Sequence, residues 1–162
     1  MFRSDEQQRF YQLIARHMAE QDGPLLLEGG TGIGKTRAYL AAIAESDQRI
    51  AVVLPTYQLI DQVLNSDDLK ATGVEAAAFR RADLFEHRRD YLANKERVTE
   101  APVMLCTSAS VLIDQRLRGE YNGVTTRDYI VFDEADQLPA AAGLQRDMRV
   151  DPIELSDARI PV

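Results

Sequence analysis

One glycine-rich segment limits the folds open to this chain more than any other feature of its 162 residues. Residues 29–36, with the sequence GGTGIGKT, fit the pattern G-x-x-x-x-G-K-[ST]. Glycines at these places let successive backbone N–H groups turn toward one anion without Cβ clashes. An apolar run at residues 25–28 precedes the segment and a helical pattern over 34–45 follows it. We therefore expect a buried strand, a phosphate-binding loop and a helix whose N-terminus faces the phosphate.

Strands and amphipathic helices alternate along the rest of the sequence. Apolar, β-branched runs predict strands, and apolar residues three or four apart predict helices. The further predicted strands are residues 50–54, 103–107 and 129–132, and the further predicted helices are residues 56–65 and 109–117. This alternation is typical of an α/β domain with a mainly parallel sheet. We assign the domain to residues 1–145 and treat 146–162 as a following segment or tail.

Two carboxylates, Asp133 and Glu134, follow the last of these strands. The carboxyl tip of a strand is where ligands bind in open α/β sheets. We predict that Asp133 holds Mg²⁺ and that Glu134 polarises the attacking water. Lys35 would reach the β- and γ-phosphates and Thr36 would ligate Mg²⁺, so ATP and Mg²⁺ are the expected cofactors. The predicted nucleotide contacts in the loop are Gly30, Thr31, Gly32, Ile33, Gly34, Lys35 and Thr36.

These motifs resemble those of superfamily 2 helicases. Residues 28–36 are similar to motif I of that superfamily, and residues 133–136, with the sequence DEAD, are similar to its motif II. Residues 37–40 are especially similar to the DinG/XPD branch of DNA helicases. The resemblance spans residues 3–138 and implies a RecA-like P-loop domain, the first of the two in such motors. In the DinG/XPD branch the full-length motor would move 5′→3′ on single-stranded DNA.

The resemblance also implies roles for residues outside motifs I and II. Gln7 matches the spacing of the glutamine that reads adenine in the family. Residues 55–62 resemble motif Ia, and Thr107 and Ser108 stand where the family has another loop that faces DNA. The resemblance therefore implies nucleic-acid contacts at Thr56, Tyr57, Thr107 and Ser108.

The segment between motif Ia and motif II contains no cysteine before Cys106. Many DinG/XPD proteins bind an iron–sulfur cluster there through thiolates, which a single cysteine cannot supply. An iron–sulfur cluster is therefore excluded, and we expect residues 71–100 to form a short insertion in its place. Cluster-free relatives include the DinG-type helicases associated with CRISPR systems, which makes a CRISPR effector complex a candidate partner.

The net charge of −7 means that any nucleic-acid contact must come from a local basic patch. Residues 79–97 contain no proline or glycine and predict one helix. On that helix Arg81, Arg88 and Lys95 would share one stripe, which we predict contacts backbone phosphates. Arginine stems also commonly cover an apolar core while their heads stay in water, so a purely structural stripe is the alternative.

Several parts of a complete helicase are missing from these residues. No segment after Leu138 resembles motif III, and the motifs of a second RecA-like domain, with its arginine finger, are absent. We therefore expect a domain that is incomplete at its C-terminus and, since Met1 suits a natural start, the N-terminal piece of a longer helicase. By itself it would bind nucleotide weakly and hydrolyse it slowly. No apolar run reaches the roughly 20 residues that span a bilayer, so we expect a cytoplasmic protein with no membrane contact.

Two other functions stay open. Asp136 stands where DinG/XPD proteins usually have histidine, and residues 55–62 also fit DEAD-box RNA helicases, for which the strand would be RNA. The second alternative is a non-catalytic module that uses the P-loop fold to bind a protein partner.

Overall fold

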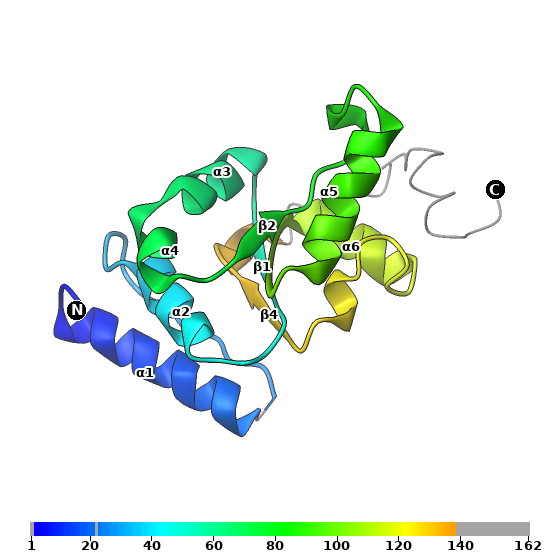
Figure 1. The fold of residues 1–162 in the computed structure, drawn as a ribbon. Helices are drawn as coiled ribbons and strands as arrows, with labels where there is room; N and C mark the ends of the chain where they lie inside the picture. Colours follow the sequence, from blue (N-terminus) through cyan, green and yellow to red (C-terminus); the bar gives the residue numbers. More distant parts are fainter. Residues whose placement is uncertain (1, 22, 139–162) are drawn as a thin grey trace. The chain divides into compact units, whose positions relative to one another are not determined.

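The computed structural model describes residues 2–21 and 23–138, and its strands form a four-stranded parallel sheet (Figure 1). The elements in chain order are α1 (Asp5–Glu20), α2 (Lys35–Ala44), β1 (Ile50–Leu54), α3 (Tyr57–Asn65), α4 (Asp67–Thr72), β2 (Ala76–Ala78), η1 (Ala82–Leu84), α5 (Arg88–Glu100), β3 (Val103–Thr107), α6 (Ser108–Arg116), η2 (Val124–Thr126), β4 (Tyr129–Phe132) and η3 (Ala135–Gln137). The chain divides into two compact units. The first unit comprises Met1–Gln48 and Asn65–Val74, and the second comprises the remaining residues. The predicted domain boundary at residue 145 lies outside the described residues.

The first unit contains α1, α2 and α4. Ser4 caps α1 by accepting a 3.1 Å hydrogen bond from the backbone N–H of Gln7, and Asp5 adds a carboxylate to the first turn, where the helix dipole favours it. The apolar face of α1 buries Ile14 and Met18, and α1 packs along α2. Helix α2 was predicted over residues 34–45, and the structure confirms it within one residue at each end.

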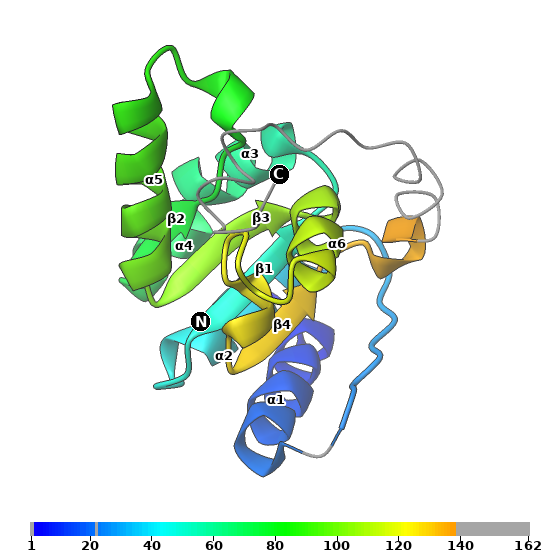
Figure 2. The same cartoon turned by 90° about the vertical axis from the view of Figure 1, so that its right-hand side faces the viewer.

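The second unit contains the sheet, in the order β2-β3-β1-β4, with every neighbouring pair parallel (Figure 2). The predicted strands at 50–54, 103–107 and 129–132 all form with these bounds. β1 and β3 are buried along their whole length, as expected for central strands of a parallel sheet. The α/β fold class with a parallel sheet is therefore confirmed.

Helices α5 and α6 pack on the sheet of the second unit (Figure 1). The core there combines side chains of the strands, such as Val53 and Met104, with the aromatic rings of Phe79, Tyr91 and Tyr121. The rings of Phe79 and Tyr121 meet edge to face with centroids 5.2 Å apart, a favoured geometry for aromatic pairs. All four strands are parallel, so the segments that follow them emerge at one edge of the sheet.

The strand predicted at residues 25–28 is wrong. Residues 24–30 have no regular secondary structure, and the Leu26 side chain is 87% exposed. An apolar run signals the tendency to be buried, but a parallel strand also needs a neighbour to receive its backbone hydrogen bonds. The sheet of the described residues consists of β1 to β4 alone, so this run has no neighbouring strand.

The single helix predicted over residues 79–97 is also wrong, since α5 begins only at Arg88. Phe79 instead prolongs β2, with its backbone N–H 2.8 Å from the carbonyl oxygen of Leu105 and its side chain fully buried. Burying this ring in the core stabilises the extended backbone more than helix propensity opposes it. Arg81 therefore lies in the loop before η1, and Arg81, Arg88 and Lys95 do not share one helical stripe. Of the predicted insertion at residues 71–100, residues 75–100 supply β2 and α5 to the second unit, and residues 71–74 belong to the first unit.

Candidate functional site

The glycine-rich loop of the first unit ends directly at α2. Gly32 and Gly34 have φ angles of +83° and +82°, in the left-handed region that glycine adopts without strain. A Cβ on Gly32 would meet nothing within 4 Å, so the space beside this residue is open. Gly34 is the N-cap of α2 and provides no side chain to bind the first N–H groups of the helix. These N–H groups and the helix dipole suit an anion, so the loop fits the phosphates of a nucleotide.

Lys35, the first residue of α2, bends back over this loop. Its Nζ donates a hydrogen bond of 3.3 Å to the carbonyl oxygen of Gly29, at the other end of the loop. The ammonium group therefore lies at the mouth of the cradle, where it can neutralise phosphate charge. Thr36 follows in the first turn of α2 and is half-buried.

Gln7 is packed against Gly34, the last glycine of the loop. Its Nε2 donates a 3.0 Å hydrogen bond to the carbonyl oxygen of Gly34, and its Oε1 accepts a 2.7 Å hydrogen bond from the backbone N–H of Arg3. Only 1% of Gln7 is exposed. The structure thus brings Gln7 to the loop but engages both ends of its amide with protein, and the adenine contact stays a prediction.

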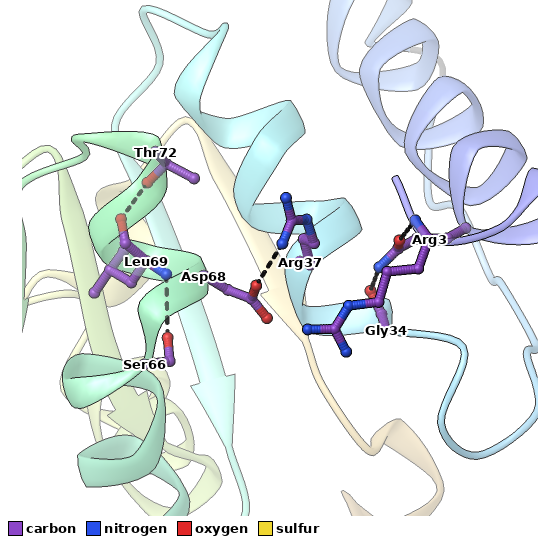
Figure 3. Close-up of polar contacts among 8 residues, drawn as sticks. Arg3, Gly34, Arg37, Ser66, Asp68, Leu69 and Thr72 are labelled. Atoms are coloured by element: carbon purple, nitrogen blue, oxygen red, sulfur yellow. Dashed lines mark hydrogen bonds and ion pairs between the residues drawn. The ribbon is translucent and has the colours of Figure 1, made fainter. Parts of the chain in front are cut away.

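A second contact holds α2 from its other side. Arg37 pairs with Asp68 of α4 at 3.1 Å, and both side chains are about 30% exposed (Figure 3). Ser66 caps α4 by accepting a 3.1 Å hydrogen bond from the N–H of Leu69. Because Arg37 lies in the first turn of α2, the ion pair helps to fix the helix end that forms the phosphate cradle.

Asp133 and Glu134 belong to the second unit and lie at the carboxyl end of β4. The backbone N–H of Asp133 donates a 3.0 Å hydrogen bond to the carbonyl of Val53, which extends the pairing with β1 by one residue. Glu134 has a φ of +55° and is exposed. Non-glycine residues in this left-handed region are uncommon and cluster at functional sites. The two predicted catalytic carboxylates thus form the turn between β4 and η3.

The resemblance of residues 29–36 and 133–136 to helicase motifs agrees with a comparison of the sequence with protein families. The model of the DEAD/DEAH box helicase family matches residues 5–150. The chain belongs to the DEAD/DEAH box helicase family. The prediction of a superfamily 2 helicase domain is therefore confirmed.

Three relatives of this helicase domain are yeast proteins named ATP-dependent RNA helicase DBP6. The protein of Candida albicans is 27% identical over 126 residues, which cover 72% of this chain and 20% of the relative. The protein of Meyerozyma guilliermondii is 32% identical over 125 residues, which cover 72% of this chain and 19% of the relative. The protein of Vanderwaltozyma polyspora is 28% identical over 138 residues, which cover 79% of this chain and 21% of the relative. The chain thus spans about a fifth of the length of these relatives, and none of the three is named as a DinG/XPD or CRISPR-associated protein.

The residues of the helicase domain that were predicted to contact nucleic acid are only partly brought together. At the carboxyl edge of the sheet, Thr107 is the last residue of β3, and the segments that follow β1, β2 and β3 carry the others, Thr56, Tyr57, Arg81 and Ser108. Thr56 is exposed, whereas Thr107 and Ser108 are only 6% and 8% exposed. The Thr107 hydroxyl caps α6 and lies 3.1 Å from the Ser110 hydroxyl.

The basic residues around α5 are placed differently. Arg81 pairs with Asp83 at 2.9 Å, and Arg88 and Lys95 lie two turns apart on α5. Their contact with nucleic acid stays a prediction. No helix in residues 2–21 or 23–138 is long and apolar enough to cross a membrane.

Three polar residues that the sequence did not single out organise the second unit. Asn94, 7% exposed, fixes the end of β2 by donating to the carbonyl of Ala78 and accepting from the N–H of Arg80. Arg127, also 7% exposed, donates 2.6 Å hydrogen bonds to the carbonyls of Val98 and Ala101 and so caps α5. The third residue is Asp114.

The Asp114 carboxylate is fully buried in α6. It accepts hydrogen bonds of 2.7 to 3.1 Å from four backbone N–H groups and one hydroxyl, which belong to Tyr121, Asn122, Gly123 and Thr125. The sequence signal for Asp114 is weak. It directly follows three apolar residues, 111–113, within a predicted helix, and many solvated aspartates share that pattern.

Proposed function

We propose that this chain is the ATP-binding, first RecA-like domain of an RNA helicase. The observation that carries the proposal is the glycine-rich loop of residues 29–34, which runs into α2 with Lys35 bonded back to Gly29, in a member of the DEAD/DEAH box family. The names of the relatives favour RNA over the DNA strand expected from the DinG/XPD resemblance.

Each residue of the site has a proposed part. The N–H groups of residues 30–35 and the Lys35 ammonium would bind the phosphates of ATP. Thr36 and Asp133 carry the oxygens that suit Mg²⁺, and the bound ion would neutralise the charge that develops on the phosphates. Glu134 would orient water and accept its proton. Gln7 would recognise the adenine edge.

We propose that fast hydrolysis also needs an arginine finger from a second RecA-like domain. The arginine finger expected from a second RecA-like domain has no counterpart among the motifs of the chain. An arginine of this kind raises the rate of related enzymes about 10³-fold or more. We propose that the chain by itself binds Mg·ATP, turns it over slowly and needs the second domain as its partner.

DNA is the second candidate substrate, because residues 37–40 resemble the DinG/XPD branch. The test is fluorescence anisotropy with labelled single strands of RNA and DNA that have the same sequence and length, in the presence of Mg²⁺ and a non-hydrolysable ATP analogue. Tighter binding of RNA supports the proposal. Tighter binding of DNA would favour the DinG/XPD-like motor instead, and binding of neither strand would contradict both.

A further inference from the structure

Arg80 makes a set of contacts across the carboxyl edge of the sheet. Its guanidinium carbon lies 5.1 Å from the centroid of the Tyr57 ring, within the range of a cation–π interaction. The same guanidinium pairs with the Asp61 carboxylate, one turn farther along α3. The Arg80 side chain is only 20% exposed, whereas that of Asp61 is 57% exposed.

The sheet order makes this contact a bridge. Arg80 follows β2 and Tyr57 follows β1, and β3 lies between these two strands. The Arg80 side chain therefore joins segments that are separated by the end of β3, where α6 begins. The backbone of Arg80 is itself held, because its N–H donates a 3.2 Å hydrogen bond to Oδ1 of the buried Asn94.

The far side of the bridge is the start of α3. Thr56 precedes Tyr57, and its hydroxyl accepts a 3.3 Å hydrogen bond from the N–H of Leu59, which closes the first turn of the helix. Thr56 is exposed and is the most accessible of the motif Ia residues proposed to meet the nucleic-acid backbone. Fixing the Tyr57 ring therefore fixes the neighbouring Thr56 as well.

We propose that Arg80 is a positioning residue for nucleic-acid binding, which holds Tyr57 and Thr56 in the orientation that receives the strand. This inference rests on the proposed function and adds a residue to it. Arg80 acts through Tyr57, because its own charge is committed to Asp61 and to the ring. A planar guanidinium can stack on a ring and bind a carboxylate at once, whereas a lysine ammonium lacks this geometry.

The test compares Arg80→Ala and Arg80→Lys with a matched control, Arg89→Ala, by RNA anisotropy over a series of salt concentrations. Arg89 is an arginine of α5 whose side chain is 83% exposed and pairs with the adjacent Asp90 at 3.5 Å. Positioning predicts that both Arg80 variants bind about three- to tenfold more weakly. It predicts that the slope of log Kd against log salt stays unchanged, since no phosphate contact is lost. Arg89→Ala should bind within about twofold of the unaltered chain.

Two results would overturn the inference while leaving the proposed function intact. The first is unaltered RNA binding by Arg80→Ala. The second is recovery of binding in Arg80→Lys together with a salt slope in Arg80→Ala that is smaller by about one, the pattern of a direct phosphate contact. Failure of the unaltered chain to bind either RNA or DNA would overturn the inference together with the proposed function.

A second readout separates positioning from loss of the fold. Backbone hydrogen exchange at Leu59 and Ile60 should accelerate in both Arg80 variants, because their N–H groups bond to Thr56 at the start of α3. The amides of β3 should keep their protection. Unchanged exchange at Leu59 and Ile60 in Arg80→Ala would contradict a positioning role.

Discussion

The Nε2 atom of Gln7 lies 3.0 Å from the carbonyl oxygen of Gly34, so a side chain of α1 contacts the residue that ends the phosphate-binding loop. These two residues are 27 positions apart in sequence. Gly34 can accept this neighbour only because it lacks a Cβ, which would fall 2.1 Å from Nε2 of Gln7. The contact therefore constrains both the residue type at position 34 and the shape of the loop.

Replacing Gly34 by alanine should damage the fold more than an equivalent change elsewhere. Gly73 is the control, since its φ is +68° but its Cβ would meet nothing within 4 Å. Each substitution places alanine in the left-handed region, at a cost of about 1–2 kcal/mol. Gly34→Ala should cost about 1–3 kcal/mol more, because it displaces a buried amide from its hydrogen bond. Denaturant unfolding of both variants measures the difference, and equal losses would contradict the close contact.

Gln7→Leu separates two roles of this glutamine. If the amide exchanges its Gly34 contact for the adenine base, the variant should bind ATP more weakly and lose its preference for ATP over GTP. If Gln7 only supports the loop, the affinities for ATP and GTP should fall by the same factor. Titrations of the variant and the unaltered chain with both nucleotides decide between these outcomes, and we expect the loss of preference.

The stability of the chain should depend on Cys106 at alkaline pH. Burial, together with nearby Asp114, raises the pKa of the Cys106 thiol to about 12. The folded state therefore favours the protonated thiol. The contribution of the thiol to the free energy of unfolding is complete below the unfolded pKa of about 8.5–9 and is lost as the pH rises toward 12. The free energy of unfolding should fall from this cause by at most about 1.4 kcal/mol per pH unit above pH 9.

Cys106→Val provides the control for that prediction, because valine fills a similar volume and does not titrate. Urea unfolding from pH 8 upward should show a shallower decline in this variant than in the unaltered chain. The comparison cancels the titration of tyrosines, such as Tyr57 and Tyr129, whose pKa values burial also raises. Equal slopes for the two proteins would show that the thiol does not stay protonated in the fold.

Asp114→Asn should be strongly destabilising, since an amide can satisfy only part of the five hydrogen bonds that the carboxylate accepts. We expect a loss of about 2–4 kcal/mol in the free energy of unfolding. Asp136→Asn, at an exposed position, should change stability by less than about 0.5 kcal/mol. A similar small effect at both positions would mean that the loop from Tyr121 to Thr125 does not depend on the buried carboxylate.

Local sequence pattern was sufficient to predict the elements whose apolar pattern and length indicate the same type of secondary structure. β1, β3 and β4 are short apolar runs with β-branched residues, and α2 has one apolar face after a glycine N-cap. The pattern failed where a distant partner decides the outcome. Residues 25–28 look like a strand but lack one to pair with among β1 to β4, and Phe79 looks helical but bonds to Leu105.

The residues of the candidate site also divide into those that a local pattern indicates and those that depend on a distant partner. Lys35, Thr36, Asp133 and Glu134 stand in contiguous motifs, whose chemistry can be predicted from residue type and spacing. Arg80 could not be recognised in this way, because its importance comes from Tyr57 and Asp61 across the end of β3. A contact of that kind depends on strand order, which sequence periodicity does not encode.

Calorimetric titration of the chain with Mg·ATP tests the central claim most directly, in comparison with Lys35→Ala and Lys70→Ala. Lys70 is a matched control, since its side chain is 65% exposed on α4 and pairs with Asp67 at 3.6 Å. The account predicts saturable binding by the unaltered chain and by Lys70→Ala, and binding at least about tenfold weaker in Lys35→Ala, because the phosphates lose a charged partner. Equal affinity in all three proteins, or no binding by the unaltered chain, would contradict the assignment of residues 29–36 as a nucleotide-binding loop.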